Sequence, residues 1–499
     1  MLYTSTRDNS IRVTAAQAIA QGISEEGGLF VPVELPNFDI NKISSMTTMS
    51  YIDRAKTVLK EFLTDFSEEE LDYCVSGAYA AQKFSSPQIA PTVNVDGNKN
   101  ILELWHGPTC AFKDMALQLL PYLMTVSAKK TADGKTIVIL VATSGDTGKA
   151  ALEGFKDVDH TKIIVFYPVD GVSPMQKHQM NTQEGNNVTV CAIKGNFDDA
   201  QTGVKKIFTT PEISAKLEAN NMLFSSANSI NWGRLLPQIV YYISAYCDLV
   251  NAGKIAMGDK INVVVPTGNF GNILASYYAS IMGLPINKFI CASNSNNVLS
   301  DFIKTGVYDK NRHFYTTISP SMDILVSSNL ERLLYKLSGN NADTTKELMT
   351  ALKTVGKYEV SDEIKAEITS KFFGGFCNDE QTKATIKALF DTDNYLCDTH
   401  TAVAVNVYEQ YVEQTGDTTP SVIASTASPY KFSKAVLEAV SDGTDLPENE
   451  FDMVEKLFEV SNAPVPAPLA ALKDKKARFS DVTEVNSMPQ YVLDALNIK

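Results

Sequence analysis

Short apolar runs rich in β-branched residues alternate along the middle of the chain with longer segments in which apolar residues recur at helical spacing. The clearest runs occupy residues 136–142 (TIVILVA), 162–167 (KIIVFY), 187–193 (NVTVCAI) and 261–265 (INVVV). Continuous apolar runs of this length are typical of parallel strands that helices cover on both faces. The pattern therefore predicts repeated α/β units around open parallel sheets.

Other parts of the chain carry a helical pattern instead. Apolar residues at helical spacing predict helices over 15–22, 51–62 and 68–82, and therefore a helical N-terminal region. Residues of about 340–391 are also largely helical and charged, and we expect them to form a peripheral elaboration. Residues 462–469 (NAPVPAPL) have the composition of a linker, and a final helical segment follows them.

Two of the expected strands run directly into glycine-containing turns that open a helix. Thr143-Ser-Gly-Asp-Thr-Gly148 follows the strand at 136–142, and Pro266-Thr-Gly-Asn-Phe-Gly-Asn272 follows the strand at 261–265. Open α/β sheets bind small molecules at the carboxyl ends of their strands. We therefore expect both turns to face a ligand.

Composition and charge narrow the class of protein. A chain of 499 residues predicts two or more domains, and 44% apolar with 20% charged residues is typical of globular proteins. The formal charge of −14 opposes binding to nucleic acid or to anionic membranes. No signal-peptide pattern opens the chain, and no apolar run reaches membrane-spanning length. The seven cysteines include no C-x-x-C pair, so we expect reduced thiols in a cytoplasmic protein.

The first candidate for chemistry is Lys113, in the segment LWHGPTCAFKDMALQ over residues 104–118. It stands between the apolar Phe112 and a short helical run. Apolar surroundings help a lysine to lose its proton, which the formation of a Schiff base requires. A lysine that extends to solvent at a helix start, beside Asp114, would give the same local pattern.

The second candidate is a phosphate cradle formed by Gly268, Asn269, Phe270, Gly271 and Asn272. Glycines let backbone N–H groups converge on an anion, and the N-terminus of the following helix adds a partial positive charge. Neither a Walker lysine nor the G-x-G-x-x-G pattern is present, so a cofactor monophosphate fits best. A glycine-rich turn with capping asparagines is the plain alternative.

Three further groups of polar residues complete the candidate site. Thr143, Ser144 and Thr147 offer hydroxyl groups at a helix start and suit an amino-acid carboxylate, although a capped turn has the same composition. Asn228, Ser229 and Arg234 suit a second phosphate, whereas Arg234 on an exposed helix face is the plain alternative. Thr426 follows an apolar strand and could place a hydroxyl at a ring nitrogen of a cofactor, although Ser/Thr turns are common everywhere.

Four segments together resemble the signatures of threonine synthases: HGPTCAFKD (106–114), ATSGDTG (142–148), NSINWGR (228–234) and PTGNFGN (266–272). The resemblance extends over nearly the whole chain and is to the long bacterial and fungal form. It implies an α/β fold of fold-type II, the fold of pyridoxal-phosphate (PLP) enzymes similar to the tryptophan synthase β subunit, with two open, mainly parallel sheets and an N-terminal helical domain. The domains expected on this basis are 1–85 (helical), 86–115 with 235–440 (large, PLP-binding), 116–234 (small) and 441–499 (C-terminal segment).

The resemblance also implies a reaction and the residues that serve it. O-phospho-L-homoserine and water would give L-threonine and phosphate by β,γ-elimination and replacement, with Lys113 forming the Schiff base and acting as acid and base. Thr426 would face the pyridine nitrogen, and Asp146 would lie near the ring hydroxyl. No metal ion and no macromolecular partner are implied, and monomer and homo-oligomer both stay open. The family often has His at the position of Ser428, which we therefore assign no role.

Two other functions fit part of this pattern. Another PLP lyase, such as a serine/threonine dehydratase or a phospho-amino-acid lyase, would share Lys113 and the cradle but would lack the second phosphate site. A non-catalytic homologue that binds a ligand or a protein would lack the Schiff base altogether.

Overall fold

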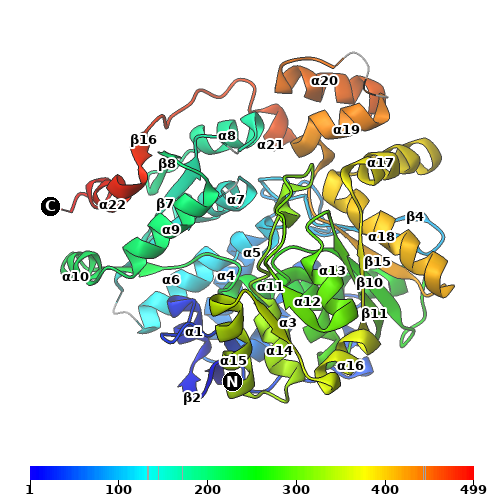
Figure 1. The fold of residues 1–499 in the computed structure, drawn as a ribbon, viewed down its shortest axis with the longest axis horizontal. Coiled ribbons are helices and arrows are strands. Elements are labelled where there is room, and N and C mark those ends of the chain that lie inside the picture. The colour runs from blue at the N-terminus through cyan, green and yellow to red at the C-terminus, as the bar shows by residue number, and fades with distance from the viewer. Residues whose placement is uncertain (132–133, 144, 171, 442, 444–445, 499) are drawn as a thin grey trace.

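Two open parallel sheets form the framework of the molecule (Figure 1). A computed structural model describes residues 1–131, 134–143, 145–170, 172–441, 443 and 446–498. In order along the chain, its α-helices are α1 Ala15–Gln21, α2 Ile40–Ser45, α3 Tyr51–Phe62, α4 Glu68–Ala78, α5 Asp114–Leu117, α6 Leu120–Thr131, α7 Asp146–Phe155, α8 Pro174–Asn181, α9 Phe197–Phe208, α10 Pro211–Ala219, α11 Trp232–Asn251, α12 Gly271–Met282, α13 Val298–Thr305, α14 Leu330–Leu337, α15 Ala342–Thr354, α16 Asp362–Lys371, α17 Asp379–Asp393, α18 Thr399–Thr415, α19 Ser433–Val440, α20 Glu450–Ser461, α21 Ala467–Ala470 and α22 Met488–Ala495. Short 3-10 helices are η1 Pro320–Met322, η2 Pro429–Phe432 and η3 Val485–Ser487. Within the described ranges, no helix combines the length and the apolarity needed to cross a bilayer.

The larger sheet has six strands in the order β14-β11-β10-β15-β5-β4. Its strands are β4 Thr92–Asp96, β5 Lys99–Glu103, β10 Ile261–Pro266, β11 Ile286–Ser293, β14 Phe372–Phe376 and β15 Ser421–Ser425. All neighbours are parallel except β4, which pairs with β5 in the antiparallel sense. Val263 and Val265 of β10 face the core that contains α11 and α12, whereas Val264 faces the core that contains α18. Burial on both faces explains the unbroken apolar run of this strand.

The smaller sheet has five parallel strands in the order β16-β8-β7-β6-β9. They are β6 Thr136–Ala142, β7 Thr161–Pro168, β8 Val188–Lys194, β9 Met222–Ser225 and β16 Val482–Glu484. The two parallel sheets confirm the predicted fold class, and the four predicted apolar strands coincide with β6, β7, β8 and β10. The C-terminal segment returns to this sheet, where β16 and α22 lie beside β8 and α9 (Figure 1). The sequence predicted the final helix but not the three-residue strand.

The N-terminal region contains the predicted helices and also a small antiparallel sheet. The helices predicted over 15–22, 51–62 and 68–82 are α1, α3 and α4, the last of them ending earlier than expected. The sheet has the order β2-β1-β3, with β1 Tyr3–Ser5, β2 Asp8–Val13 and β3 Phe30–Pro32. Two of these strands have three residues, and β2 is largely solvent-facing, so none of them carries an apolar alternation that predicts a strand.

The segment expected to be a peripheral helical elaboration contributes to the large sheet. Helices α15, α16 and α17 agree with the expectation, but β14 (FFGGF) pairs in parallel with β11 and forms the edge of the sheet. The short β12 Val307–Asp309 and β13 Lys357–Glu359 pair with each other. A Cβ atom on Gly374 would lie 2.9 Å from the backbone of Ser300 in α13, so this position requires glycine. Glycine is uncommon within strands, and the sequence of β14 therefore does not show the apolar pattern that predicts a strand. The segment is largely helical, as expected, and its strand β14 also makes it part of the large sheet.

Candidate active site

Lys113 lies at the carboxyl edge of the large sheet, next to Thr426. The chain leaves β5 at Glu103, and its next residues run beside the chain that leaves β15. Phe112 donates its N–H to the carbonyl of Thr426 over 2.8 Å, and Ser428 donates to the carbonyl of Cys110 over 3.0 Å. Two residues predicted to serve one ligand, far apart in the sequence, are thus held on adjacent backbones.

The amine of Lys113 is prepared to lose its proton. The side chain is half-buried, and its Nζ lies 4.7 Å from the centre of the Phe112 ring. Burial and the charges of Lys431 and Arg234 lower the pKa of Lys113 to about 8, against the opposing charge of Asp146. This shift makes the neutral amine, the form that forms a Schiff base, more abundant than in an ordinary lysine.

Asp114 is occupied elsewhere and is not the ion-pair partner of Lys113. Its two carboxylate oxygens accept the N–H and the hydroxyl of Thr109 over 2.8 and 2.6 Å. Burial raises the pKa of Asp114 to about 6, although the two bonds from Thr109 oppose this rise. A Cβ on Gly107 would lie 2.6 Å from the same carboxylate, so the loop before Lys113 folds closely around it. The lysine extending to solvent beside Asp114, the plain alternative, does not describe this site.

The predicted phosphate cradle has unused hydrogen-bond donors. Phe270 adopts a left-handed conformation with φ of 61°, and α12 begins at the next residue without a side-chain cap. Asn272 is buried, and its Nδ2 has no hydrogen-bond partner among the described residues, while its Oδ1 accepts the hydroxyl of Tyr242. An unpaired donor inside a protein costs free energy unless a ligand satisfies it. The turn therefore has the composition and the geometry of an anion site.

A segment that the sequence analysis did not select supports this cradle from behind. Ser327 donates its hydroxyl to the carbonyl of Gly268 over 2.7 Å. Asn329 donates its backbone N–H and its Nδ2 to the carbonyl of Asn269 over 3.0 and 3.1 Å. A Cβ on Gly268 would lie 2.8 Å from the carbonyl oxygen of Ser321, so this side of the loop is closed. The supporting residues occupy carbonyl groups and leave the donors of the cradle free.

In the turn after β6, Thr143 forms hydrogen bonds to backbone N–H groups of the same turn. Thr143 accepts the N–H groups of Gly145 and Gly148 on its Oγ1 over 3.0 and 2.9 Å, so its hydroxyl keeps one proton to donate. Thr147 is half-buried in the first turn of α7. Ser144, the third residue predicted to bind the carboxylate, lies outside the described residues.

Asp146 forms a buried ion pair with Lys431, a residue that the sequence analysis did not select. Lys431 Nζ lies 2.9 Å from Asp146 Oδ1, and Gln176 Nε2 donates to the same oxygen over 3.1 Å. Burial alone would raise the pKa of Asp146, but the charges of Lys431 and Lys113 hold it well below its ordinary value. Asp146 is therefore a carboxylate at neutral pH.

Arg234 is a buried cation without a protein counter-ion. It is 4% exposed, and one of its terminal nitrogens donates to the carbonyl of Ala227. Its Nε has no hydrogen-bond partner in the described part of the chain, and no carboxylate there forms an ion pair with it. Burial lowers the pKa of Arg234 to about 10. The exposed helix face considered as an alternative is excluded, and a buried unpaired guanidinium points to an anionic ligand.

The predicted second phosphate site lies against the first. Asn228 is exposed, and Ser229 is half-buried. Asn329 Nδ2, which donates to Asn269, also donates to the carbonyl of Ser229 over 3.3 Å. Arg332 holds this bridge in place, because it donates to Asn329 Oδ1 and to the carbonyl of Ile230. The structure thus brings together the two predicted anion sites.

Thr426 and Ser428 differ in what surrounds them. Thr426 is 6% exposed at the end of β15. The Oγ of Ser428 accepts the N–H of Tyr430 over 3.4 Å and caps η2, which accounts for this serine without a role in chemistry.

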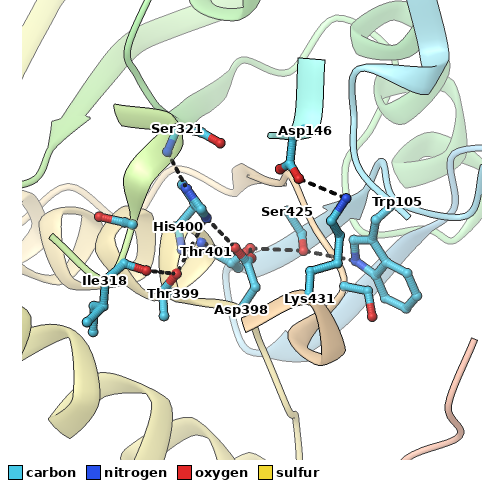
Figure 2. Close-up of polar contacts among 12 residues, drawn as sticks. Trp105, Asp146, Ile318, Ser321, Asp398, Thr399, His400, Thr401, Ser425 and Lys431 are labelled. Atoms are coloured by element: carbon cyan, nitrogen blue, oxygen red, sulfur yellow. Dashed lines mark hydrogen bonds and ion pairs between the residues drawn. The ribbon is translucent and has the colours of Figure 1, made fainter. Parts of the chain in front are cut away.

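A chain of hydrogen bonds behind Thr426 connects β15 to the cradle (Figure 2). Trp105 Nε1 donates to Ser425 Oγ over 3.1 Å, and Ser425 shares a 3.0 Å hydrogen bond with Thr401. Thr401 and His400 both bond to the carboxylate of Asp398, and His400 Nε2 accepts the N–H of Ser321. Ser321 is the residue that closes the loop behind Gly268.

The chain matches the family models "Threonine synthase N terminus" over residues 2–79, "Pyridoxal-phosphate dependent enzyme" over 101–370 and "Threonine synthase, C-terminal" over 401–492. It is 38% identical over 459 residues to the threonine synthase of Pseudomonas aeruginosa, covering 91% of this chain and 94% of that protein. The chain belongs to the threonine synthase family.

Two further threonine synthase relatives extend the comparison. A crystal structure of PLP-bound threonine synthase from Brucella melitensis superposes with a TM-score of 0.88 at 36% identity over 99% of both chains. Threonine synthase-like 1 of Homo sapiens is 40% identical over 435 residues, which cover 85% of this chain. The chain spans 58% of the length of that human protein.

Proposed function

We propose that this chain is a PLP-dependent enzyme that converts O-phospho-L-homoserine and water into L-threonine and phosphate. One observation supports this more than any other: two buried donors without partners, Asn272 Nδ2 and Arg234 Nε, belong to two separate anion sites around one amine, Lys113. A cofactor with one phosphate and a substrate with another require two such sites. A dehydratase that acts on serine or threonine needs only the first.

The residues present fit PLP. The uncapped start of α12 and Asn272 would hold its phosphate, Lys113 would bond to its aldehyde carbon, and the hydroxyl of Thr426 would meet its ring nitrogen. When bound, the conjugated ring of PLP acts as an electron sink and makes protons on the substrate carbons removable. A hydroxyl at the ring nitrogen leaves the ring less electron-withdrawing than a carboxylate partner would.

Lys113 would move the protons of the reaction. Because its pKa is about 8, the amine can accept a proton from the substrate α-carbon and later return a proton under the same conditions. We assign the binding of the substrate carboxylate to the start of α7. The hydroxyl groups of Thr147 and Ser144 would bind it, together with the remaining hydroxyl proton of Thr143. This grip orients the α-carbon toward Lys113.

Arg234, Asn228 and Ser229 would bind the substrate phosphate. The planar guanidinium makes two parallel hydrogen bonds to a phosphate, and the buried position of Arg234 strengthens them. As the phosphate leaves, its growing charge stays next to a fixed cation, which lowers the barrier to its departure.

The domain division and the location of the protein are part of this proposal. The large-sheet strands all fall within 86–115 and 235–440, and the small-sheet strands, except β16, fall within 116–234. A cytoplasmic enzyme with a small-molecule substrate is supported by the seven cysteines, which are all free and buried. We propose neither a nucleic-acid partner nor a preference between monomer and homo-oligomer.

The test is an assay of threonine and phosphate together, on protein supplied with PLP and O-phospho-L-homoserine. Lys113→Ala is expected to lower turnover by at least about 1000-fold, because the proton carrier is lost. Borohydride reduction with PLP should modify Lys113 in the unaltered protein. Lys149→Met is the matched control, since Lys149 is a buried lysine paired with Glu153 on α7.

Three results would each reject the proposal. These are a keto acid in place of threonine, the absence of a borohydride adduct on Lys113, and threonine formation that survives Lys113→Ala.

A further inference from the structure

Two lysines lie near one buried carboxylate. Lys431, on η2, is fully buried, and its Nζ lies 2.9 Å from Asp146 Oδ1 (Figure 2). The same Nζ lies 2.9 Å from the carbonyl oxygen of Thr109. Lys113 is the second lysine, since its charge also acts on Asp146. Only Lys431 touches the carboxylate in an ion pair among the described residues.

A carboxylate buried at this depth needs one cation. Asp146 is 5% exposed, and an ionised carboxylate taken out of water is strongly destabilised unless a positive charge pairs with it. If Lys431 were absent, the nearest cation that could compensate Asp146 would be Lys113. A protonated lysine in an ion pair does not attack an aldehyde.

We propose that Lys431 is a positioning residue that serves as the permanent counter-ion of Asp146 and thereby keeps the amine of Lys113 out of an ion pair and free to bond to the cofactor aldehyde. The inference deepens the proposed function and rests on it. The geometry that carries it is the direct contact of Lys431 with Asp146, in a pocket that excludes water from the ammonium group.

The second contact of Lys431 adds a reason for its position. It donates to the carbonyl of Thr109, and Thr109 holds the carboxylate of Asp114 through two hydrogen bonds. Asp114 is the residue after Lys113. Lys431 therefore connects the turn before α7 to the loop that carries the reactive amine.

The other charged groups around Lys113 do not replace this pairing. Asp114 and Asp146 raise its pKa, whereas Lys431 and Arg234 lower it. Burial raises the pKa of the neighbouring Cys110 thiol to about 12, so that thiol is neutral. Asp114 is already bound by Thr109, which leaves Asp146 as the carboxylate that decides whether Lys113 is charged.

The test measures the protonation of Lys113 in the full chain without cofactor. Acetic anhydride at limiting amounts labels neutral amines, and mass spectrometry of the Lys113 peptide against pH gives the labelling midpoint. We expect a midpoint near 8 in the unaltered protein. Lys431→Met should raise it by about one pH unit or more, because Asp146 then pairs with Lys113. Labelling at pH 8 would fall accordingly.

The opposite variant makes the test independent of how well Lys431→Met folds. Asp146→Asn should lower the Lys113 midpoint, since the attracting charge is lost while Lys431 stays. Lys431→Met with Asp146→Asn should fall between the two single variants. Lys431→Arg keeps the cation and should stay near the unaltered midpoint.

A purely structural role of Lys431 predicts different results. An unchanged or lowered midpoint in Lys431→Met, or an unchanged midpoint in Asp146→Asn, would overturn the inference. Lys149→Met controls for the loss of any buried lysine from this region and should leave the midpoint in place. Borohydride trapping of PLP on Lys113 of the unaltered protein separates the two ideas. Its failure rejects the proposed function, whereas unmoved midpoints reject only the role of Lys431.

Discussion

The turns after β6 and β10 follow the same strand-turn-helix plan, but they differ in what uses their hydrogen-bonding groups. In the turn after β6, Thr143 takes up the N–H groups of Gly145 and Gly148, and Asp146 is paired with Lys431. In the turn after β10, Asn272 Nδ2 has no partner in the described part of the chain, whereas α7 and α12 both begin without a side-chain N-cap.

The difference separates a turn that is braced by its own side chains, where we propose that the substrate carboxylate binds, from one whose donors we assign to the cofactor phosphate. In the first turn, the described residues Thr143 and Asp146 bond to other groups of the protein. The second is supported only through its carbonyl groups, so its donors remain for a phosphate. Two turns with similar sequences thus have different roles in one site. Three pairs of matched variants test this difference.

The largest expected effect comes from a carboxylate placed in the first turn of each helix. Asn272→Asp puts a negative charge where we propose the cofactor phosphate, and we expect the Kd for PLP to rise about 100-fold, since like charges then face each other and a donor is lost. Thr147→Asp puts the same charge at the start of α7. It should leave the Kd for PLP within about twofold and raise the KM for the substrate about 10-fold, by repelling its carboxylate.

Absorbance titration with PLP and initial rates measure these two effects. If both variants weakened PLP equally, the turns would be interchangeable anion sites and the division would be wrong. Asn272→Asp with unchanged PLP affinity would remove the cradle from the proposed site.

The next effect concerns stability and a glycine in each turn. Gly145 has φ of 137°, and its added Cβ would lie 2.3 Å from Gln176 Cδ. Gly145→Ala should lower the free energy of unfolding by about 2 kcal/mol, because the cost of a strained backbone adds to the cost of displacing the Gln176 side chain. Gly271 begins α12, and its added Cβ would lie 3.4 Å from Asn329 Nδ2. Gly271→Ala should change the free energy of unfolding by less than about 0.5 kcal/mol.

Urea titration without PLP compares the two glycine variants. Equal losses would mean that the turn after β10 is as rigidly satisfied as the turn after β6, contrary to the comparison. A stable Gly145→Ala variant would show that Gln176 does not fix the first turn.

Much of the framework follows from the sequence because buried parallel strands have an unmistakable pattern. The runs at 136–142 and 261–265 predicted β6 and β10, and with them the place of both turns. Several of the strands that were missed are short or lie at edges, but the eight-residue β11, between β14 and β10, was missed as well. β14 has two glycines in five residues, and β16 has three residues that gain their partner only when the C-terminal segment returns to β8.

The candidate site was predictable where chemistry and spacing coincide, and not where it depends on contacts across the fold. Lys113 was selected because it stands between the apolar Phe112 and a short helical run, and Lys431, between Tyr430 and Phe432, offered a similar signal. Its partner Asp146 is nearly 300 residues away, so no local pattern reports the ion pair. Asn329 joins the two predicted anion sites by donating to the carbonyl groups of Ser229 and Asn269. Every residue has a backbone carbonyl group, so the sequence could not indicate these contacts.

The smallest expected effect separates two neighbouring tyrosines of α11. Tyr242 donates its hydroxyl to Asn272 Oδ1 and so turns the Asn272 amide with its Nδ2 toward the cradle. Tyr242→Phe should raise the Kd for PLP about fivefold, the loss expected for one hydrogen bond of about 1 kcal/mol that orients a ligand group. Tyr241→Phe is the matched control, because Tyr241 is equally buried and donates its hydroxyl to Gln238 Oε1.

Absorbance titration resolves a fivefold change between these variants. We expect Tyr241→Phe to bind PLP as tightly as the unaltered protein, although both variants lose one buried hydroxyl. A matching loss in Tyr241→Phe would assign the effect to α11 as a whole. A loss of PLP affinity in Tyr242→Phe alone would identify Asn272, held by Tyr242, as the donor that distinguishes the turn after β10 from the turn after β6.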